Sequence, residues 1–177
     1  MCNHFHLSLQ SGCNETLKRM NRKYTIEQIE DSINLLRKKF EDVALTTDII
    51  VGFPGENEKE FESTYKFLKN IKLTKIHVFK YSPREGTRAA VMPNQIDGNL
   101  KEQRSEKLIK LSNENEEAFI KSQKGKCVEV LFEEKEGKYW RGHSSNYLMV
   151  KKEGINLENV LQTVKIDGVN ELYLMGR

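Results

Sequence analysis

The sequence has few cysteines and no long hydrophobic run. Cys2, Cys13 and Cys127 are widely spaced and form no Cys-x-x-Cys pair, which argues against a disulfide framework and against a structural zinc site. No apolar stretch approaches the length of a membrane span, and residues 1–6 lack the charged and apolar segments of a signal peptide. We therefore expect a cytoplasmic protein with free thiols and no membrane partner.

Nucleotide-binding motifs are also absent. The turn Gly52-Phe53-Pro54-Gly55-Glu56 is not followed by Lys-Ser or Lys-Thr, and no Gly-x-Gly-x-x-Gly occurs, which argues against hydrolysis of a nucleoside triphosphate. The net charge of +3 is too small to indicate a nucleic-acid partner by itself, although basic residues are enriched at positions 17–23 and 72–104.

Strand-like and helix-like segments alternate over the first 123 of the 177 residues. The patterns predict strands at 4–9, 43–51 and 72–81 and helices at 26–40, from 57 onward and at 100–123, the helix at 26 opening with a Thr25–Gln28 capping box. Short connections favour right-handed crossovers and a parallel sheet. The ends of the three strands then meet at one edge, where small-molecule sites are common.

The pattern changes after Gly125. Five short alternating segments, separated by glycines, predict a small β-barrel with strands at 127–132, 138–142, 147–151, 160–166 and 170–174. We therefore expect two domains, 1–123 and 124–177. Three parallel strands cannot close a barrel and leave an unpaired edge at 4–9, so we expect that an N-terminal part is missing and that the chain self-associates.

Several polar residues are candidates for chemistry. His4 and His6 lie on one side of a strand, but no third metal ligand has a matching spacing, so a core or supporting role is favoured over a metal site. His77 and His143 are isolated and are interpreted in the same way. Asp48 is favoured as a hydrogen-bonding residue over a proton donor or acceptor.

Two further features have open interpretations. Gly52 and Gly55 permit close approach of the backbone to a ligand, but an ordinary strand-to-helix turn needs the same residues. In the C-terminal part, aromatic, cationic and amide side chains alternate, which suits stacking on RNA bases but also suits the core of a small domain. The residues of this second group are Tyr139, Trp140, Arg141, His143, Asn146 and Tyr147.

Four motifs in order resemble the radical S-adenosylmethionine (SAM) methylthiotransferase family. They are His6-Leu7-Ser8-Leu9-Gln10-Ser11-Gly12, Leu17-Lys18-Arg19-Met20-Asn21-Arg22, Asp48-Ile49-Ile50-Val51-Gly52-Phe53-Pro54-Gly55-Glu56 and Tyr81-Ser82-Pro83-Arg84-Glu85-Gly86-Thr87. The segment from about Lys124 is similar to the TRAM domain, the RNA-binding β-barrel of these enzymes. The resemblance implies an α/β fold, the C-terminal part of a radical SAM β/α barrel, followed by a small all-β TRAM barrel.

The segment His77–Ser82 and the position of Cys13 resemble most the bacterial branch that converts N6-threonylcarbamoyladenosine at position 37 of tRNA to its 2-methylthio form. The implied partner is the anticodon stem-loop of tRNA, whereas the sulfur donor and the electron donor are not specified. The branch acting on isopentenyladenosine 37, the branch acting on a ribosomal protein and a non-catalytic RNA-binding remnant stay as alternatives. A barrel enzyme for a phosphorylated metabolite explains neither the four motifs nor the appended barrel.

The resemblance implies SAM and two [4Fe-4S] clusters in the full-length enzyme. One cluster requires a Cys-x-x-x-Cys-x-x-Cys loop, which this sequence lacks. We therefore expect no metal ligand and no catalytic residue in this chain, and no activity from it alone.

The remaining roles that the resemblance implies concern the cofactor and the RNA. Gln10 and Ser11 are candidates for the ribose hydroxyls or the amino-acid part of SAM, Arg22 for its carboxylate, and Ile50, Val51 and Gly52 for adenine, with Tyr81 as a pocket wall. Arg84, Arg88 and Arg141 are candidates for contact with RNA phosphates.

Overall fold

The computed structural model describes residues 2–170 and 173–177, and the chain forms two compact units. The sheet unit comprises His6–Lys39 and Leu45–Asn115, and the barrel unit comprises Met1–Phe5, Phe40–Ala44 and Glu116–Arg177. The domain boundary expected at 123 and 124 stays a prediction. The two compact units do not divide at this boundary. Three short segments from outside 124–177, namely 1–5, 40–44 and 116–123, belong to the barrel unit.

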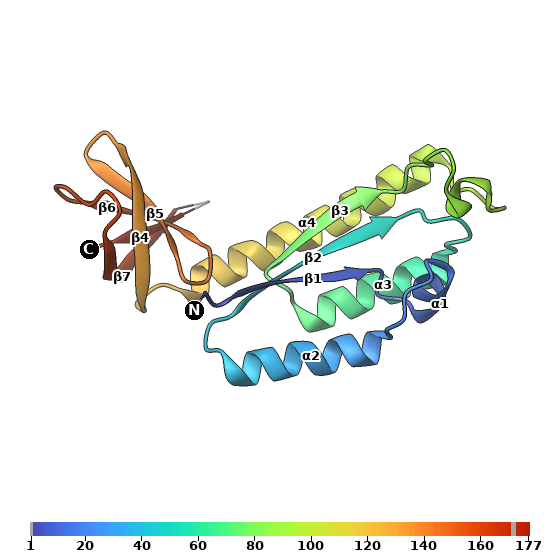
Figure 1. Cartoon of the computed structure of the whole chain (residues 1–177), viewed down its shortest axis with the longest axis horizontal. Coiled ribbons are helices and arrows are strands. Elements are labelled where there is room, and N and C mark those ends of the chain that lie inside the picture. Colours follow the sequence, from blue (N-terminus) through green and yellow to red (C-terminus); the bar gives the residue numbers. More distant parts are fainter. Residues whose placement is uncertain (1, 171–172) are drawn as a thin grey trace. The chain divides into compact units, whose positions relative to one another are not determined.

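Three strands, β1 (His4–Gln10), β2 (Ala44–Val51) and β3 (Lys75–Lys80), form a sheet in the order β1-β2-β3. Their arrows run in the same direction (Figure 1), and β2 pairs in parallel with β3 from Thr46 opposite Lys75 to Val51 opposite Lys80. The expected parallel α/β arrangement is therefore confirmed. β1 lies at the edge of this sheet.

The helices are α1 (Asn14–Arg19), α2 (Ile26–Lys39), α3 (Glu58–Ile71), the 3-10 helix η1 (Arg88–Val91) and α4 (Gly98–Ser122). The three longer helices, α2, α3 and α4, follow the strands in the order that the sequence predicts, whereas α1 and η1 were not predicted. The capping box before α2 is confirmed, because Gln28 N donates to Thr25 Oγ1 at 3.4 Å and Thr25 N donates to Gln28 Oε1 at 3.0 Å. The six residues of α1 are too few to show a helical period, so this helix was not predicted.

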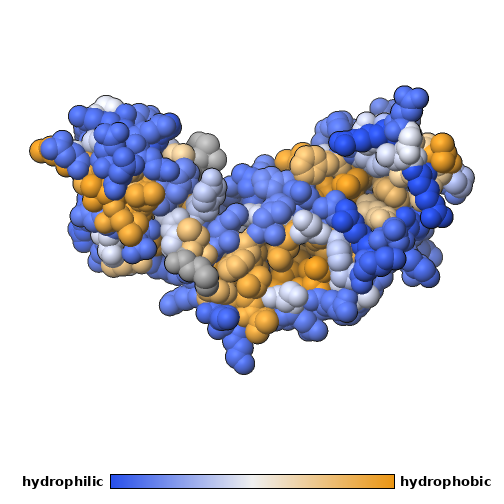
Figure 2. Space-filling model, in the orientation of Figure 1, coloured by the Kyte–Doolittle hydropathy of each residue, from blue (hydrophilic) through white to orange (hydrophobic). Residues whose placement is uncertain are grey.

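The two faces of the sheet differ in burial. On β2, Leu45, Ile49 and Val51 are buried, and α3 contributes Phe61 and Leu68 to the same core. Asp48 and Ile50 alternate with these residues and are partly exposed. One sheet face therefore forms the core, and the other carries partly exposed side chains that a ligand can reach. Figure 2 shows hydrophobic side chains gathered in the middle of the visible face, with hydrophilic ones around them.

The barrel unit contains a closed five-stranded barrel in the order β4-β5-β6-β8-β7. Its strands are β4 (Cys127–Glu136), β5 (Tyr139–Ser144), β6 (Met149–Glu153), β7 (Leu161–Asn170) and β8 (Tyr173–Gly176). The core is apolar and includes Phe132, Trp140 and Leu174. Gly142 permits a close strand approach at the bulge in β4, since a Cβ there would lie 2.0 Å from Leu131 O.

The predicted small β-barrel is confirmed, but several predicted strand ends are wrong. β4 and β7 run four residues further than expected, because each continues past an irregularity in its pairing that no period-2 pattern marks. Among the described residues, no helix is long and apolar enough to cross a membrane.

Candidate functional site

A pocket of about 340 Å³ lies where β2 and β3 end. Ile50 and Phe79 are register partners on the two strands, and the 52% exposure of the Phe79 side chain leaves an apolar surface open. The complete lining is Ile50, Phe79, Lys80, Tyr81, Ser82, Arg84, Thr87 and Ala89. A flat apolar ring with polar substituents suits this combination of an apolar floor and a polar, cationic rim.

Tyr81 lines this pocket, and its hydroxyl group is buried beside it. Its ring lies edge-on to Phe53, with centroids 5.3 Å apart, and its backbone N donates to Val51 O at 2.9 Å. The hydroxyl is buried and has no hydrogen-bond partner in the described part of the chain. Since an unsatisfied buried hydroxyl is costly, a bound molecule that reached the Tyr81 hydroxyl would gain a hydrogen bond and remove this cost.

Gly52 forms the turn after β2 with φ of 71°, in the region that favours glycine. Its N–H donates to Glu56 Oε1 at 3.0 Å. A Cβ at this position would lie 2.3 Å from Lys101 Cγ, and Lys101 Nζ in turn donates to Tyr81 O at 3.0 Å. The glycine is therefore required both by its backbone conformation and by the lysine that packs on it.

Glu56 and Arg104 form a buried ion pair behind this turn. Each side chain is 3% exposed, and Arg104 Nη1 donates to Glu56 Oε1 at 2.8 Å and to Glu56 O at 3.0 Å. Burial raises the pKa of Glu56, against the opposing effects of the Gly52 N–H and the Arg104 charge. The carboxylate thus joins the Gly52 turn to α4.

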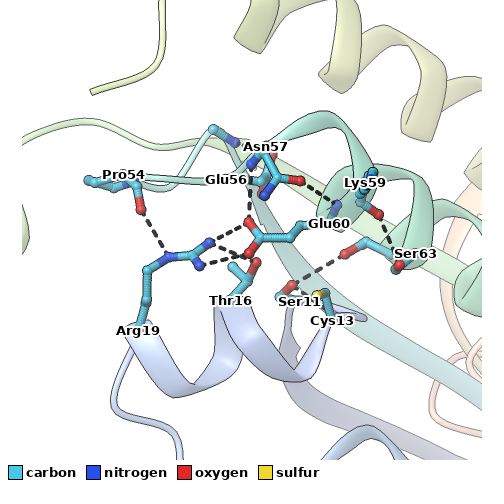
Figure 3. A network of polar contacts seen from close by, with 12 residues as sticks. Ser11, Cys13, Thr16, Arg19, Pro54, Glu56, Asn57, Lys59, Glu60 and Ser63 are labelled. Carbon is cyan, nitrogen blue, oxygen red and sulfur yellow. Dashed lines mark hydrogen bonds and ion pairs between the residues drawn. The ribbon is translucent and has the colours of Figure 1, made fainter. Parts of the chain in front are cut away.

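Arg19 holds the same turn from the other side (Figure 3). Its guanidinium donates to both oxygens of Glu60, at 2.8 and 2.6 Å, to Pro54 O at 3.2 Å and to Thr16 Oγ1 at 3.2 Å. The hydrogen bonds from Arg19 lower the pKa of Glu60 and hold it as a carboxylate. Neither Arg19 nor Arg104 was predicted as part of the site. The basic motif from Leu17 to Arg22 was a signal for Arg19, whereas Arg104 had none.

The end of β1 carries a second tight turn. Ser11 N donates to Leu9 O at 2.9 Å across Gln10, whose φ is 69°. A three-residue turn with this sign of φ is rare and strained. Such outliers concentrate at functional positions, and the ligand role of Gln10 stays a prediction. Ser11 is 1% exposed, and its hydroxyl lies 3.3 Å from Thr64 Oγ1 and accepts from Cys13 N.

Polar side chains occupy the middle of the partly exposed sheet face. His6 Nε2 lies 3.4 Å from Asp48 Oδ2, and His6 Nδ1 lies 3.0 Å from Thr46 Oγ1. The His6 and His77 rings are 5.9 Å apart, and His77 is the register partner of Asp48. Within the described ranges, no group of three or more His, Cys, Asp or Glu side chains is placed to hold a metal ion. Iron-sulfur clusters are held mainly by cysteine thiolates, and none of His6, Asp48 and His77 is a cysteine, so these residues do not fit such a cluster.

The structure brings together some of the predicted cofactor residues. Ile50 and Tyr81 line one pocket, and Gly52 forms the turn next to it. Val51 is 1% exposed and contributes its carbonyl to Tyr81, and Arg22 is exposed after α1. The pocket does not include Gln10, Ser11 or Arg22.

The predicted RNA-binding arginines lie at three separate places. Arg84 lines the pocket, and Arg88 is exposed at the start of η1. Arg141 lies on β5 of the barrel unit and forms an ion pair with Glu134, which raises its pKa. The two interpretations of the aromatic residues in the barrel, base stacking or core packing, apply to different residues. Trp140 belongs to the barrel core, whereas Tyr147 is 65% exposed.

Comparison with known proteins agrees with this architecture. Residues 1–68 match the model of the Radical SAM superfamily. The threonylcarbamoyladenosine tRNA methylthiotransferase MtaB of Bacillus subtilis is 43% identical over 157 residues, which cover 86% of this chain and 35% of that protein. The tRNA-2-methylthio-N(6)-dimethylallyladenosine synthase of Ehrlichia canis is 46% identical over 134 residues, 76% of this chain and 30% of that protein.

A third relative is named for a protein substrate, whereas the first two are named for tRNA. The ribosomal protein uS12 methylthiotransferase RimO of Clostridium perfringens is 39% identical over 183 residues, 99% of this chain and 41% of that protein. The chain thus spans about a third of the length of the curated relatives that it matches.

Proposed function

Because this chain belongs to the radical SAM methylthiotransferase family, we propose that it supplies the strand-end pocket and the RNA-binding barrel of a tRNA-modifying enzyme. The proposed reaction adds a methylthio group to C2 of N6-threonylcarbamoyladenosine at position 37 of tRNA, in the anticodon stem-loop. The observation that supports it most is the 43% identity to the Bacillus subtilis relative, which extends over 86% of the chain and so includes parts of both units. The cytoplasm is the proposed location, since tRNA is modified there.

The pocket residues fit SAM. The apolar surface of Ile50 and Phe79 suits the adenine ring, with Gly52 in the adjoining turn beneath the Lys101 side chain, and the unpartnered Tyr81 hydroxyl suits a hydrogen bond to the ligand. Bound SAM would supply the radical chemistry and the methyl group that the family uses. Arg19 and Arg104 keep the turn in place, so this chain's own contribution is to bind and orient.

The remaining assignments extend the same proposal. Gln10 faces the ribose or the amino-acid part of the cofactor, and Arg22 its carboxylate. Val51 and Ser11 are each 1% exposed and support the strand ends, whereas Gln10 is 9% exposed. Arg84, Arg88 and Arg141 contact RNA phosphates. The two clusters of the full-length enzyme need ligands from elsewhere, so no step of the chemistry is assigned to them here.

A fusion protein tests this function. The N-terminal part of the Bacillus subtilis relative, up to the point where its similarity to this chain begins, is joined to residues 1–177. The fusion is incubated anaerobically with SAM, a reductant and, separately, three substrates: tRNA with threonylcarbamoyladenosine, tRNA with dimethylallyladenosine, and ribosomal protein uS12. We expect mass spectrometry to detect methylthiolation of the first substrate and its loss in the Ile50→Glu variant. Reaction with only one of the other substrates would reassign the chain, and no reaction by a folded, cluster-loaded fusion would contradict the proposal.

A further inference from the structure

Tyr147 has a backbone conformation that rarely suits a large side chain. It lies in the turn between β5 and β6, its N–H donates to Ser144 O at 2.8 Å, and its φ is 65°. Glycine or asparagine is usual where a hairpin turn needs this left-handed conformation. The ring is also 65% exposed, so its burial does not offset the cost of the backbone.

A buried amide keeps this turn in place. Asn146 is 4% exposed, and its Nδ2 donates to Gln123 Oε1 at 3.2 Å and to Asp42 O at 3.3 Å. Its Oδ1 accepts from Ser144 Oγ at 2.7 Å. All of these residues belong to the barrel unit. The neighbouring residue therefore fixes the turn, and the Tyr147 ring is presented outward without contributing to the barrel core.

The exposed ring stacks on one neighbouring aromatic side chain and contacts a second at a tilt. The Tyr147 and His143 rings are 4.8 Å apart and inclined by only 17°, and the His4 ring lies 5.3 Å from Tyr147 at 30°. The Nδ1 atom of His143 is 2.6 Å from Glu133 Oε2, which orients its ring. The near-parallel rings of Tyr147 and His143 form a flat surface, whereas aromatic side chains that pack in a core also use edge-on contacts.

We propose that Tyr147 is a stacking residue for an unpaired nucleobase of RNA bound to the barrel unit. Stacking on aromatic side chains is one of the main ways in which proteins hold single-stranded bases. The strain at Tyr147 is then retained for binding, since the fold does not need the ring. This inference rests on the proposed function only in that it takes RNA as the partner.

The test compares variants of the whole 177-residue chain. Tyr147→Asn suits the left-handed backbone but removes the ring, Tyr147→Phe keeps the ring, and Ile155→Asn removes another exposed hydrophobic side chain of the barrel unit, 86% exposed. The probes are a fluorescein-labelled anticodon stem-loop RNA with unpaired loop adenosines and a fully paired RNA of the same length. Binding is measured by fluorescence anisotropy, and unfolding by circular dichroism.

We expect Tyr147→Asn to weaken stem-loop binding by about 5- to 150-fold while its melting temperature stays equal to or above that of the unmodified chain. Binding to the paired RNA, and binding by the other two variants, should change less than about twofold. Unchanged stem-loop binding by Tyr147→Asn, or an equal loss on paired RNA, would overturn the stacking role and leave the proposed function intact. Absence of RNA binding by the unmodified chain would overturn both.

Discussion

Removal of Arg104 should destabilise the sheet unit in a pH-dependent way. Both Arg104 and Glu56 are 3% exposed, and their contacts include two hydrogen bonds from one guanidinium nitrogen. Breaking a buried pair by removing one partner typically costs about 3–5 kcal/mol, because the other charge stays buried without compensation. We therefore expect Arg104→Met to lower the free energy of unfolding by about this amount near neutral pH.

The pH dependence follows from Glu56. Burial already raises its pKa, and the charge of Arg104 lowers it, so the substitution raises the pKa further. A carboxyl group with a raised pKa in the folded state binds a proton more tightly when folded, and stability then increases as the pH falls towards the ordinary glutamate range. The cost of Arg104→Met should therefore be smaller at about pH 5 than at about pH 8.

Urea unfolding followed by circular dichroism at both pH values measures this cost. Lys107→Met is the matched control, since Lys107 lies one turn further along α4 and forms an exposed ion pair with Glu62. The control should lose less than about 1 kcal/mol. The double variant Glu56→Gln with Arg104→Met should recover part of the loss, because the amide oxygen still accepts from Gly52 N–H. A cost equal to that of the control, or one independent of pH, would refute the reasoning.

Two further predictions concern the turn after β2 and the edge of the sheet. Gly52→Ala should lower the free energy of unfolding by about 1–3 kcal/mol, because the φ of 71° at Gly52 and the contact with Lys101 both oppose a Cβ. A melting temperature equal to that of the unmodified chain would contradict this prediction. β1 lies at the edge of the sheet, so the chain should self-associate with rising concentration in sedimentation velocity. A monodisperse monomer that melts cooperatively would show that the edge is protected.

The order of the strands and of the three longer helices was predictable because each of their local signals agrees with the fold. The capping box at Thr25, the apolar run of β2 and the glycine-separated strands of the barrel all point to the observed elements. The positions of Ile50 and Tyr81 at one rim also follow, since parallel strands place their ends on the same edge.

Other features depend on contacts between distant residues, which no local pattern shows. Arg104 lies 48 positions from Glu56 and resembles any other basic residue of a charged helix. From composition, Trp140 and Tyr147 are equally suited to the core. Closure of the barrel buries Trp140, and the contacts of Asn146 fix the turn that exposes Tyr147. The ends of β4 and β7 also depend on contacts between distant residues, because each strand continues past an irregularity in its pairing with a neighbouring strand.

The most direct test of the account is a calorimetric titration of SAM into the fusion protein and its Tyr81→Phe variant. The central claim is that the pocket of this chain holds the cofactor and that the Tyr81 hydroxyl, which has no partner among the described residues, binds it. We expect saturable binding that is weaker by about 3- to 10-fold in Tyr81→Phe, while the unfolding free energy of the variant is unchanged or higher. Equal affinity in both proteins, or no binding in either, would contradict the claim.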